Sequence, residues 1–71
     1  MTDDRYMIQD LIFKRADRQG IRMTDLARRI GTTPQQINNW RRHNSQMRME
    51  YAEKCFEALN EHARENKIII Y

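Results

Sequence analysis

Arginine is concentrated in the middle of this 71-residue chain. Residues 21–48 contain six arginines, no lysine and one acidic residue, Asp25, which gives this segment a charge of +5. Residues 1–20 are neutral and residues 49–71 carry −2, so the net charge of +3 hides a strong asymmetry. The planar guanidinium group suits two-pronged hydrogen bonding to phosphate or guanine. The pattern predicts phosphate contacts from one group of side chains: Arg22, Arg28, Arg29, Arg41, Arg42 and Arg48.

The residues that usually carry catalysis or bind metal are few and scattered. Cys55 is the single cysteine, so the chain can form no internal disulfide and has no pair of thiols at metal-ligand spacing. His43 and His62 lie far apart and have no acidic or sulfur partner at a recognisable spacing. We therefore expect no enzymatic activity, no metal and no cofactor.

Length and composition favour one small folded domain spanning residues 1–71. A chain of this size buries only about 60% of its unfolded surface, so a partner subunit would add useful stability. Hydrophobic residues make up 39% and charged residues 32% of the chain, a composition that argues against disorder. No stretch approaches the roughly 20 apolar residues of a membrane-spanning helix, and the first residues lack the pattern of a signal peptide. A cytoplasmic location is expected.

Helical periodicity and local stop signals divide the chain into four helices. The first is expected over about residues 4–19, ending at Gly20. A short second helix ends at Gly31, and Thr33-Pro34 begins a third that runs to about residue 43, because Thr33 can cap it and proline fits its first position. Asn44-Ser45 can cap a long fourth helix that ends near residue 65. The apolar positions of the first helix are Tyr6, Met7, Ile8, Leu11, Ile12, Phe13 and Ala16.

Residues 23–42 have the pattern of two helices joined by a glycine-containing turn, which is a helix-turn-helix unit. Its expected shared core is Leu26, Ala27, Ile30, Ile37 and Trp40. The sequence resembles the Cro and lambda-repressor family through Gly20, Ile21, Leu26-Ala27, Ile30-Gly31-Thr32-Thr33, Ile37 and Trp40. The resemblance covers about residues 4–60 and implies a regulator, of phage or bacterial origin, that binds operator DNA.

In the geometry that the resemblance implies, the third helix enters the major groove. The expected base contacts are then Thr33, Gln35, Gln36 and Asn39, and amide side chains suit the two-point hydrogen bonding of adenine. Where this family usually has a capping serine or threonine followed by glutamine at the start of the second helix, this chain has Arg22 and Met23. That helix either begins there without its usual cap or begins later, capped by Thr24.

The chain ends in Lys67-Ile68-Ile69-Ile70-Tyr71, a β-branched and aromatic run typical of a strand. An uncovered strand of this kind would invite aggregation, so residues 67–71 are expected to pair with a second copy of the chain. The alternative is that the tail folds back over the helices of its own chain. The dimer interface would then be formed by Ile68, Ile69, Ile70 and Tyr71, and the operator would be palindromic. The expected fold class is mainly α, a small bundle of about four helices with a helix-turn-helix, plus this short C-terminal β-strand.

A sequence-specific transcriptional regulator of double-stranded DNA, most simply a Cro-type repressor, is the function that these observations favour. An antitoxin-type autorepressor fits the same residues. The alternative from a different class is a protein-interaction module that kept the fold and lost DNA binding. The arginine-rich segment beside a polar helix argues against that alternative, because such a module needs neither feature.

Overall fold

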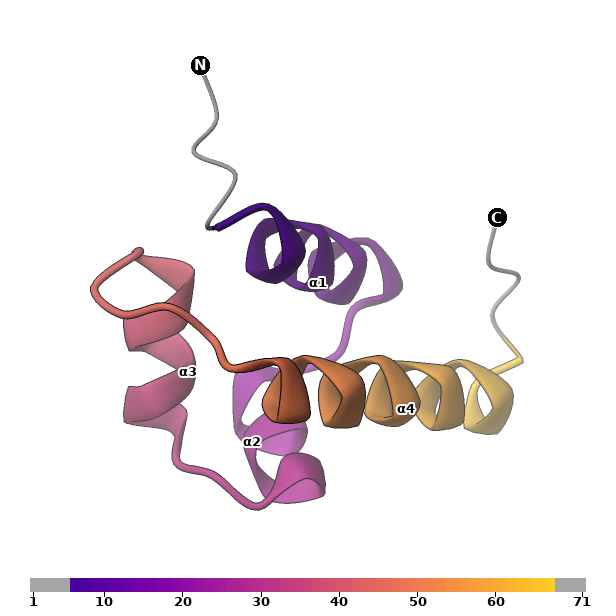
Figure 1. The fold of residues 1–71 in the computed structure, drawn as a ribbon. Coiled ribbons are helices and arrows are strands. Elements are labelled where there is room, and N and C mark those ends of the chain that lie inside the picture. Colours follow the sequence, from indigo (N-terminus) through magenta and orange to yellow (C-terminus); the bar gives the residue numbers. More distant parts are fainter. Residues whose placement is uncertain (1–5, 68–71) are drawn as a thin grey trace.

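The computed structural model describes residues 6–67 of the chain, and these residues form four α-helices. The helices are α1 (Met7–Gln19), α2 (Met23–Ile30), α3 (Pro34–Arg41) and α4 (Met49–Glu65). Helices α1 and α4 lie one above the other, while α2 and α3 stand across them (Figure 1). Both α1 and α2 pack against α4 and against α3, so the four helices enclose one core. The predicted four-helix bundle is confirmed.

Glycines end the first two helices, as the sequence predicted. Gly20 and Gly31 have φ values of 75° and 78°, a left-handed conformation that residues with a Cβ rarely adopt. Thr33 caps α3, because its side-chain oxygen accepts a hydrogen bond from the Gln36 amide over 3.1 Å, and Pro34 occupies the first turn. Local sequence signals therefore set the helix-turn-helix boundaries.

Three other predicted boundaries need correction. α1 begins at Met7 instead of about residue 4, and α3 ends at Arg41 instead of about residue 43. α4 begins at Met49, after Arg48, and not next to Asn44-Ser45. The loop between α3 and α4 cannot continue as helix, because His43 has a φ of 62° and the Met47 amide is bonded to the Gln9 side chain.

The core is built from small and branched apolar side chains of all four helices. Ile12, Leu26, Ile37 and Leu59 are fully buried, and Trp40 and Cys55 lie among them, as predicted. Three of the residues predicted on the apolar face of α1 are exposed instead: Met7, Ile8 and Leu11. The buried face of α1 is centred on Ala16, and these three side chains lie on its edge or beyond it.

Two glutamines on α1 take buried positions that an apolar pattern does not predict. Gln9 is 2% exposed and its amide nitrogen donates to the main-chain carbonyls of Trp40 and Ser45, while its oxygen accepts from the Met47 amide. Gln19 donates to the Leu59 carbonyl over 2.9 Å. Each glutamine thus joins α1 to backbone groups more than 30 residues away in the sequence.

The expected C-terminal strand finds no support. Lys67, its first residue, is in a turn with a φ of 54°, and residues 6–67 contain no strand. Ile68, Ile69, Ile70 and Tyr71 lie outside the described residues, and so does the dimer contact expected from them. None of the helices within the described range is long and apolar enough to cross a membrane.

Candidate nucleic-acid interface

Helices α2 and α3 form the predicted helix-turn-helix unit. The turn between them is closed by a hydrogen bond of 2.9 Å from the Thr32 amide to the Ala27 carbonyl. The side chains that were predicted to form the shared core are all buried: Leu26, Ala27, Ile30, Ile37 and Trp40. Because Ala27 has only a methyl group, α3 can approach α2 closely at this point. The relative orientation of the two helices is therefore fixed by packing.

The outward face of α3 carries amide side chains. Ile37 and Trp40 point into the core, which leaves Gln35 and Asn38 exposed and Asn39 half-buried. Gln35 and Asn39 lie four residues apart and so share one face of the helix. Asn38 was not among the predicted base contacts, although its position opposite the core residues is the signal that identifies it. These side chains offer paired donors and acceptors on the outward face of α3.

A groove separates α3 from the start of α4. Its walls include Thr33 and Gln36 from α3 and Arg48 and Tyr51 from the α4 side. Ser45 lies in the same groove, and its buried hydroxyl oxygen has no hydrogen-bond partner within the described residues. Gln36 thus faces the groove, on a different side of α3 from Gln35. A polar groove with one arginine at its rim suits a phosphate group.

Helices α1, α2 and α4 begin without a side-chain cap, and in α2 and α4 an arginine occupies the capping position. Arg22 precedes α2 and Arg48 precedes α4, and neither side chain accepts a hydrogen bond from the first turn. The structure therefore shows α2 beginning at Met23 without its usual cap. The first amides of a helix lack internal partners and form the positive end of the helix dipole. A cation there increases the local positive charge, which favours an anion as the missing partner.

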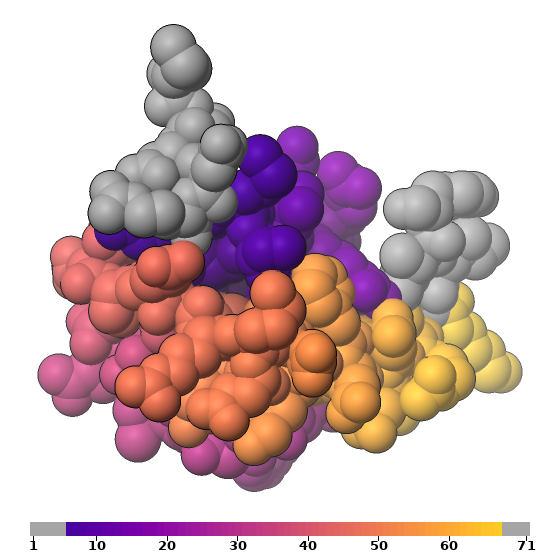
Figure 2. Space-filling view, in the orientation of Figure 1, coloured from indigo at the N-terminus to yellow at the C-terminus, as the bar shows by residue number. Residues whose placement is uncertain are grey.

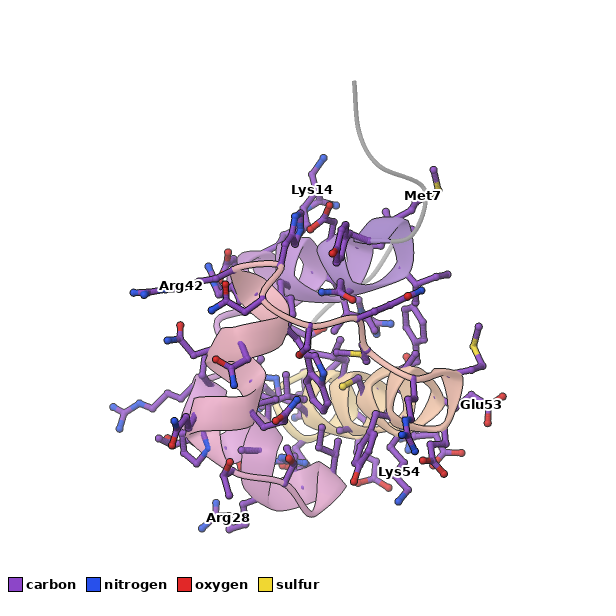
Figure 3. The ribbon with its side chains drawn as sticks, turned by 60° about the vertical axis from the view of Figure 1, so that its left-hand side comes forward. Met7, Lys14, Arg28, Arg42, Glu53 and Lys54 are labelled. Atoms are coloured by element: carbon purple, nitrogen blue, oxygen red, sulfur yellow. The ribbon has the colours of Figure 1, made fainter. Side chains whose placement is uncertain are left out.

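The six predicted phosphate-binding arginines fall into two groups. Arg22, Arg28, Arg42 and Arg48 are exposed, and the Arg28 side chain is 82% exposed even though it contacts Asp25. Figure 3 shows Arg28 and Arg42 extending from the side of the molecule that carries α2 and α3. Arg29 and Arg41 are instead bound to carboxylates of other helices, Glu65 of α4 and Asp17 of α1.

Arg29 belongs to an ion-pair network between α2 and the end of α4. Its side chain is 20% exposed, with Nε donating to Asp25 over 3.1 Å and both terminal nitrogens donating to the Glu65 carboxylate over 2.7 and 3.0 Å. The hydrogen bonds from Arg29 lower the pKa of Glu65. Partial burial raises the pKa of Asp25, but the hydrogen bonds and charges of Arg28 and Arg29 outweigh it and leave that pKa below its ordinary value. Arg29 therefore holds helices together.

Arg41 lies against α1. Its guanidinium donates to Asp17 over 2.6 Å and stands 5.7 Å from the centre of the Phe13 ring. The side chain is still 38% exposed. Arg41 thus connects the end of α3 to α1, and it would have to leave Asp17 to reach a phosphate on another face.

Two further side chains that were singled out in the sequence have structural roles. Burial raises the pKa of the Cys55 thiol to about 12, so this cysteine stays protonated and behaves as a small apolar residue. The His43 Nε2 group donates a hydrogen bond of 2.6 Å to the Asp10 carboxylate, and the ring stacks on Tyr6 with ring centres 4.3 Å apart. Both residues therefore belong to the framework that supports α3.

The fold and this surface together define a helix-turn-helix DNA-binding domain. A family model described as helix-turn-helix, of the Cro and C1 type, matches residues 12–66. The chain belongs to this family, whose members are DNA-binding transcription regulators. Comparison with curated proteins and with solved structures gave no significant match.

Proposed function

We propose that this chain is a sequence-specific repressor of Cro type that binds a palindromic operator as a homodimer. The observation that carries the proposal is the position of α3. The start of α3 shares a groove with Arg48, which precedes the uncapped α4, and Arg41 at the end of α3 lies 3.7 Å from Met23, the first residue of the uncapped α2. Amide side chains read base edges, while helix starts and arginines bind phosphates, so one surface supplies both kinds of contact.

Base reading is assigned to the first two turns of α3. Gln35 and Asn39 reach into the major groove and pair with adenine N6 and N7. Asn38 extends this outward face. Gln36, which lies in the protein groove together with Arg48, contacts the neighbouring base. The Thr33 oxygen already accepts the Gln36 amide, so its hydroxyl hydrogen is free to donate to a phosphate and its methyl group to contact thymine.

Phosphate binding is assigned to Arg22, Arg28, Arg42 and Arg48. Arg22 and Arg48 act together with the uncapped amides of α2 and α4, so that each phosphate receives main-chain and side-chain hydrogen bonds. Arg29 and Arg41 support the surface from behind through their carboxylate partners. About four arginines per subunit are therefore expected to contact DNA phosphates.

Selection of bound duplexes from a random DNA pool, followed by sequencing, tests the proposal. We expect one enriched inverted repeat whose half-sites lie about 34 Å apart, since two recognition helices of a symmetric dimer enter successive major grooves. Retention of DNA without any enriched sequence would contradict specific reading. Failure of the folded protein to retain any duplex would instead favour a protein-interaction module.

A further inference from the structure

The molecule has a second surface that could bind a partner. It lies along the line where α1 and α4 adjoin, which we call the seam. Three large apolar side chains are exposed there: Ile8 (39%), Leu11 (52%) and Met49 (61%). Ile8 and Met49 line the same groove, together with Met47 and Ala52. Exposed apolar side chains that cluster in this way mark interaction surfaces.

Helical spacing makes this seam continuous. On α1, Ile8 and Leu11 are followed at helical spacing by Arg15, whose guanidinium donates to Asn60 of α4 over 2.7 Å. On α4, Met49, the half-buried Phe56 and Asn60 repeat every seven and four residues and so lie on one side of the helix. The apolar seam thus begins at the start of α4 and is closed at its other end by the Arg15–Asn60 hydrogen bond. Figure 2 shows α1 and α4 adjoining on this face.

Opposite charges border the two sides of the seam. Lys14 and Arg18 lie four residues apart on the exposed face of α1, and Glu53 and Glu57 lie four residues apart on the exposed face of α4. None of these four side chains forms an ion pair within the described part of the chain. The two rows therefore match in spacing and are opposite in sign.

We propose that this seam, defined by Ile8, Leu11, Met49 and Phe56, is the surface on which a second copy of the chain docks. In a two-fold dimer the same patch meets itself, so α1 of one copy lies over α4 of its partner, twice. The basic row of each copy then faces the acidic row of the other, and the apolar side chains of both seams are buried between them. A partner of uniform charge would leave one of the two rows opposed by like charge.

The position of the seam is compatible with DNA binding. Figure 3 shows Met7 and Glu53 along one edge of the molecule and Arg42 along the opposite edge, so docking at the seam leaves Arg28 and Arg42 uncovered. Arg48 lines the groove of Ile8 and Met49 as well as the groove beside α3, so it lies at the border between the two surfaces. The seam would be the interface of the homodimer proposed above, and only this point rests on the proposed function. It can fail while DNA binding stands, because a monomer would still bind duplex DNA.

Sedimentation equilibrium of the full chain in the absence of DNA tests the docking surface. We expect the wild type to dimerise and the Leu11→Glu variant to have a dissociation constant at least about tenfold higher, since a charge is then placed in a desolvated contact. The double reversal Lys14→Glu with Arg18→Glu weakens the dimer, and adding Glu53→Lys with Glu57→Lys restores it. Loss of folding cannot imitate this rescue.

Two controls keep the test decisive. Lys54→Glu reverses one charge, as each half of the Lys14→Glu and Arg18→Glu pair does, but Lys54 lies on the other side of α4, over the Tyr51 ring, so this change should leave the dimer intact. Deletion of residues 68–71 should also leave a dimer. A wild type that is monomeric at high micromolar concentration would overturn the inference. So would dimers that persist in Leu11→Glu and dissociate only when residues 68–71 are removed.

Discussion

Gln9 and Trp40 are joined by a hydrogen bond of 2.5 Å from the Gln9 side-chain amide to the Trp40 main-chain carbonyl. This bond ties the last turn of α3 to α1, and the same side chain accepts the Met47 amide over 2.7 Å. One buried glutamine therefore fixes both the end of the recognition helix and the loop that leads to α4.

Replacing Gln9 by leucine should destabilise the domain and disturb DNA binding together. The buried Met47 amide would lose its partner, the Ser45 carbonyl would lose the Gln9 donor, and the Trp40 carbonyl would keep only the His43 amide, so we expect a loss of about 2–3 kcal/mol in the free energy of unfolding. Urea denaturation followed by circular dichroism measures this. Gln46→Ala, an exposed change in the same loop, is the matched control and should alter stability by less than about 0.5 kcal/mol. Equal stabilities of the two variants would contradict the assigned role of Gln9.

The salt dependence of DNA binding should reflect the exposed arginines only. Arg42→Gln or Arg48→Gln should reduce the magnitude of the slope of log affinity against log salt by about 1 for each subunit bound, because each removes one phosphate contact. Fluorescence anisotropy over a salt series measures the slope. Arg64→Gln removes an exposed charge from α4 outside this surface and should leave the slope unchanged. An effect of Arg64→Gln as large as that of Arg42→Gln would mean that net charge alone drives binding.

Amide side chains on the outward face of α3 should control base preference. Gln35→Ala and Asn39→Ala should each lower discrimination at one base pair of the half-site by about 1–3 kcal/mol, since each loses a two-point contact with its base. Competition between operator variants measures this discrimination. Asn66→Ala removes an amide beyond the end of α4 and should keep the full preference. If the α3 variants lose affinity equally on operator and random duplex while remaining folded, they act on phosphates and not on bases.

The carboxylates bound by Arg29 should make stability depend on acid pH. The pKa values of Asp25 and Glu65 are lower in the folded chain, so their contribution is present above the ordinary carboxyl pKa of about 4 and is lost as the pH falls through the lowered values. The Tm of Glu65→Gln should therefore fall less than that of the wild type between pH 7 and pH 3. Glu61→Gln, which removes an exposed carboxylate without an ion pair in the described residues, should behave as the wild type. Identical profiles for all three proteins would show that the Arg29 network adds no stability.

Features encoded by neighbouring residues were predictable from the sequence, and features that depend on distant residues were not. Thr33-Pro34, Gly20 and Gly31 act within one or two turns, and their helix boundaries were placed correctly. Asn44-Ser45 carries an equally good local capping signal, yet α4 starts later because Gln9, 38 residues before Met47, holds the loop.

In the candidate site, too, local sequence predicts some features and distant residues determine the others. The outward position of Gln35 follows from the spacing of Ile37 and Trp40 within one helix. The retention of Arg29 by Glu65 depends on a pair 36 residues apart, and no local pattern distinguishes Arg29 from its neighbour Arg28. The exposure of Leu11 likewise depends on where α4 lies across α1, because helical spacing alone allows a wider apolar face than the packing uses.

The ratio of affinities for operator and scrambled duplex, measured at one salt concentration, tests the central claim most directly. Fluorescence anisotropy should give a dissociation constant at least about a thousandfold lower for the duplex recovered by selection than for a scrambled duplex of the same length and composition. That ratio should fall in Gln35→Ala and persist in Asn66→Ala. Equal affinities for the two duplexes would show that α3 does not read sequence and would contradict the proposed function.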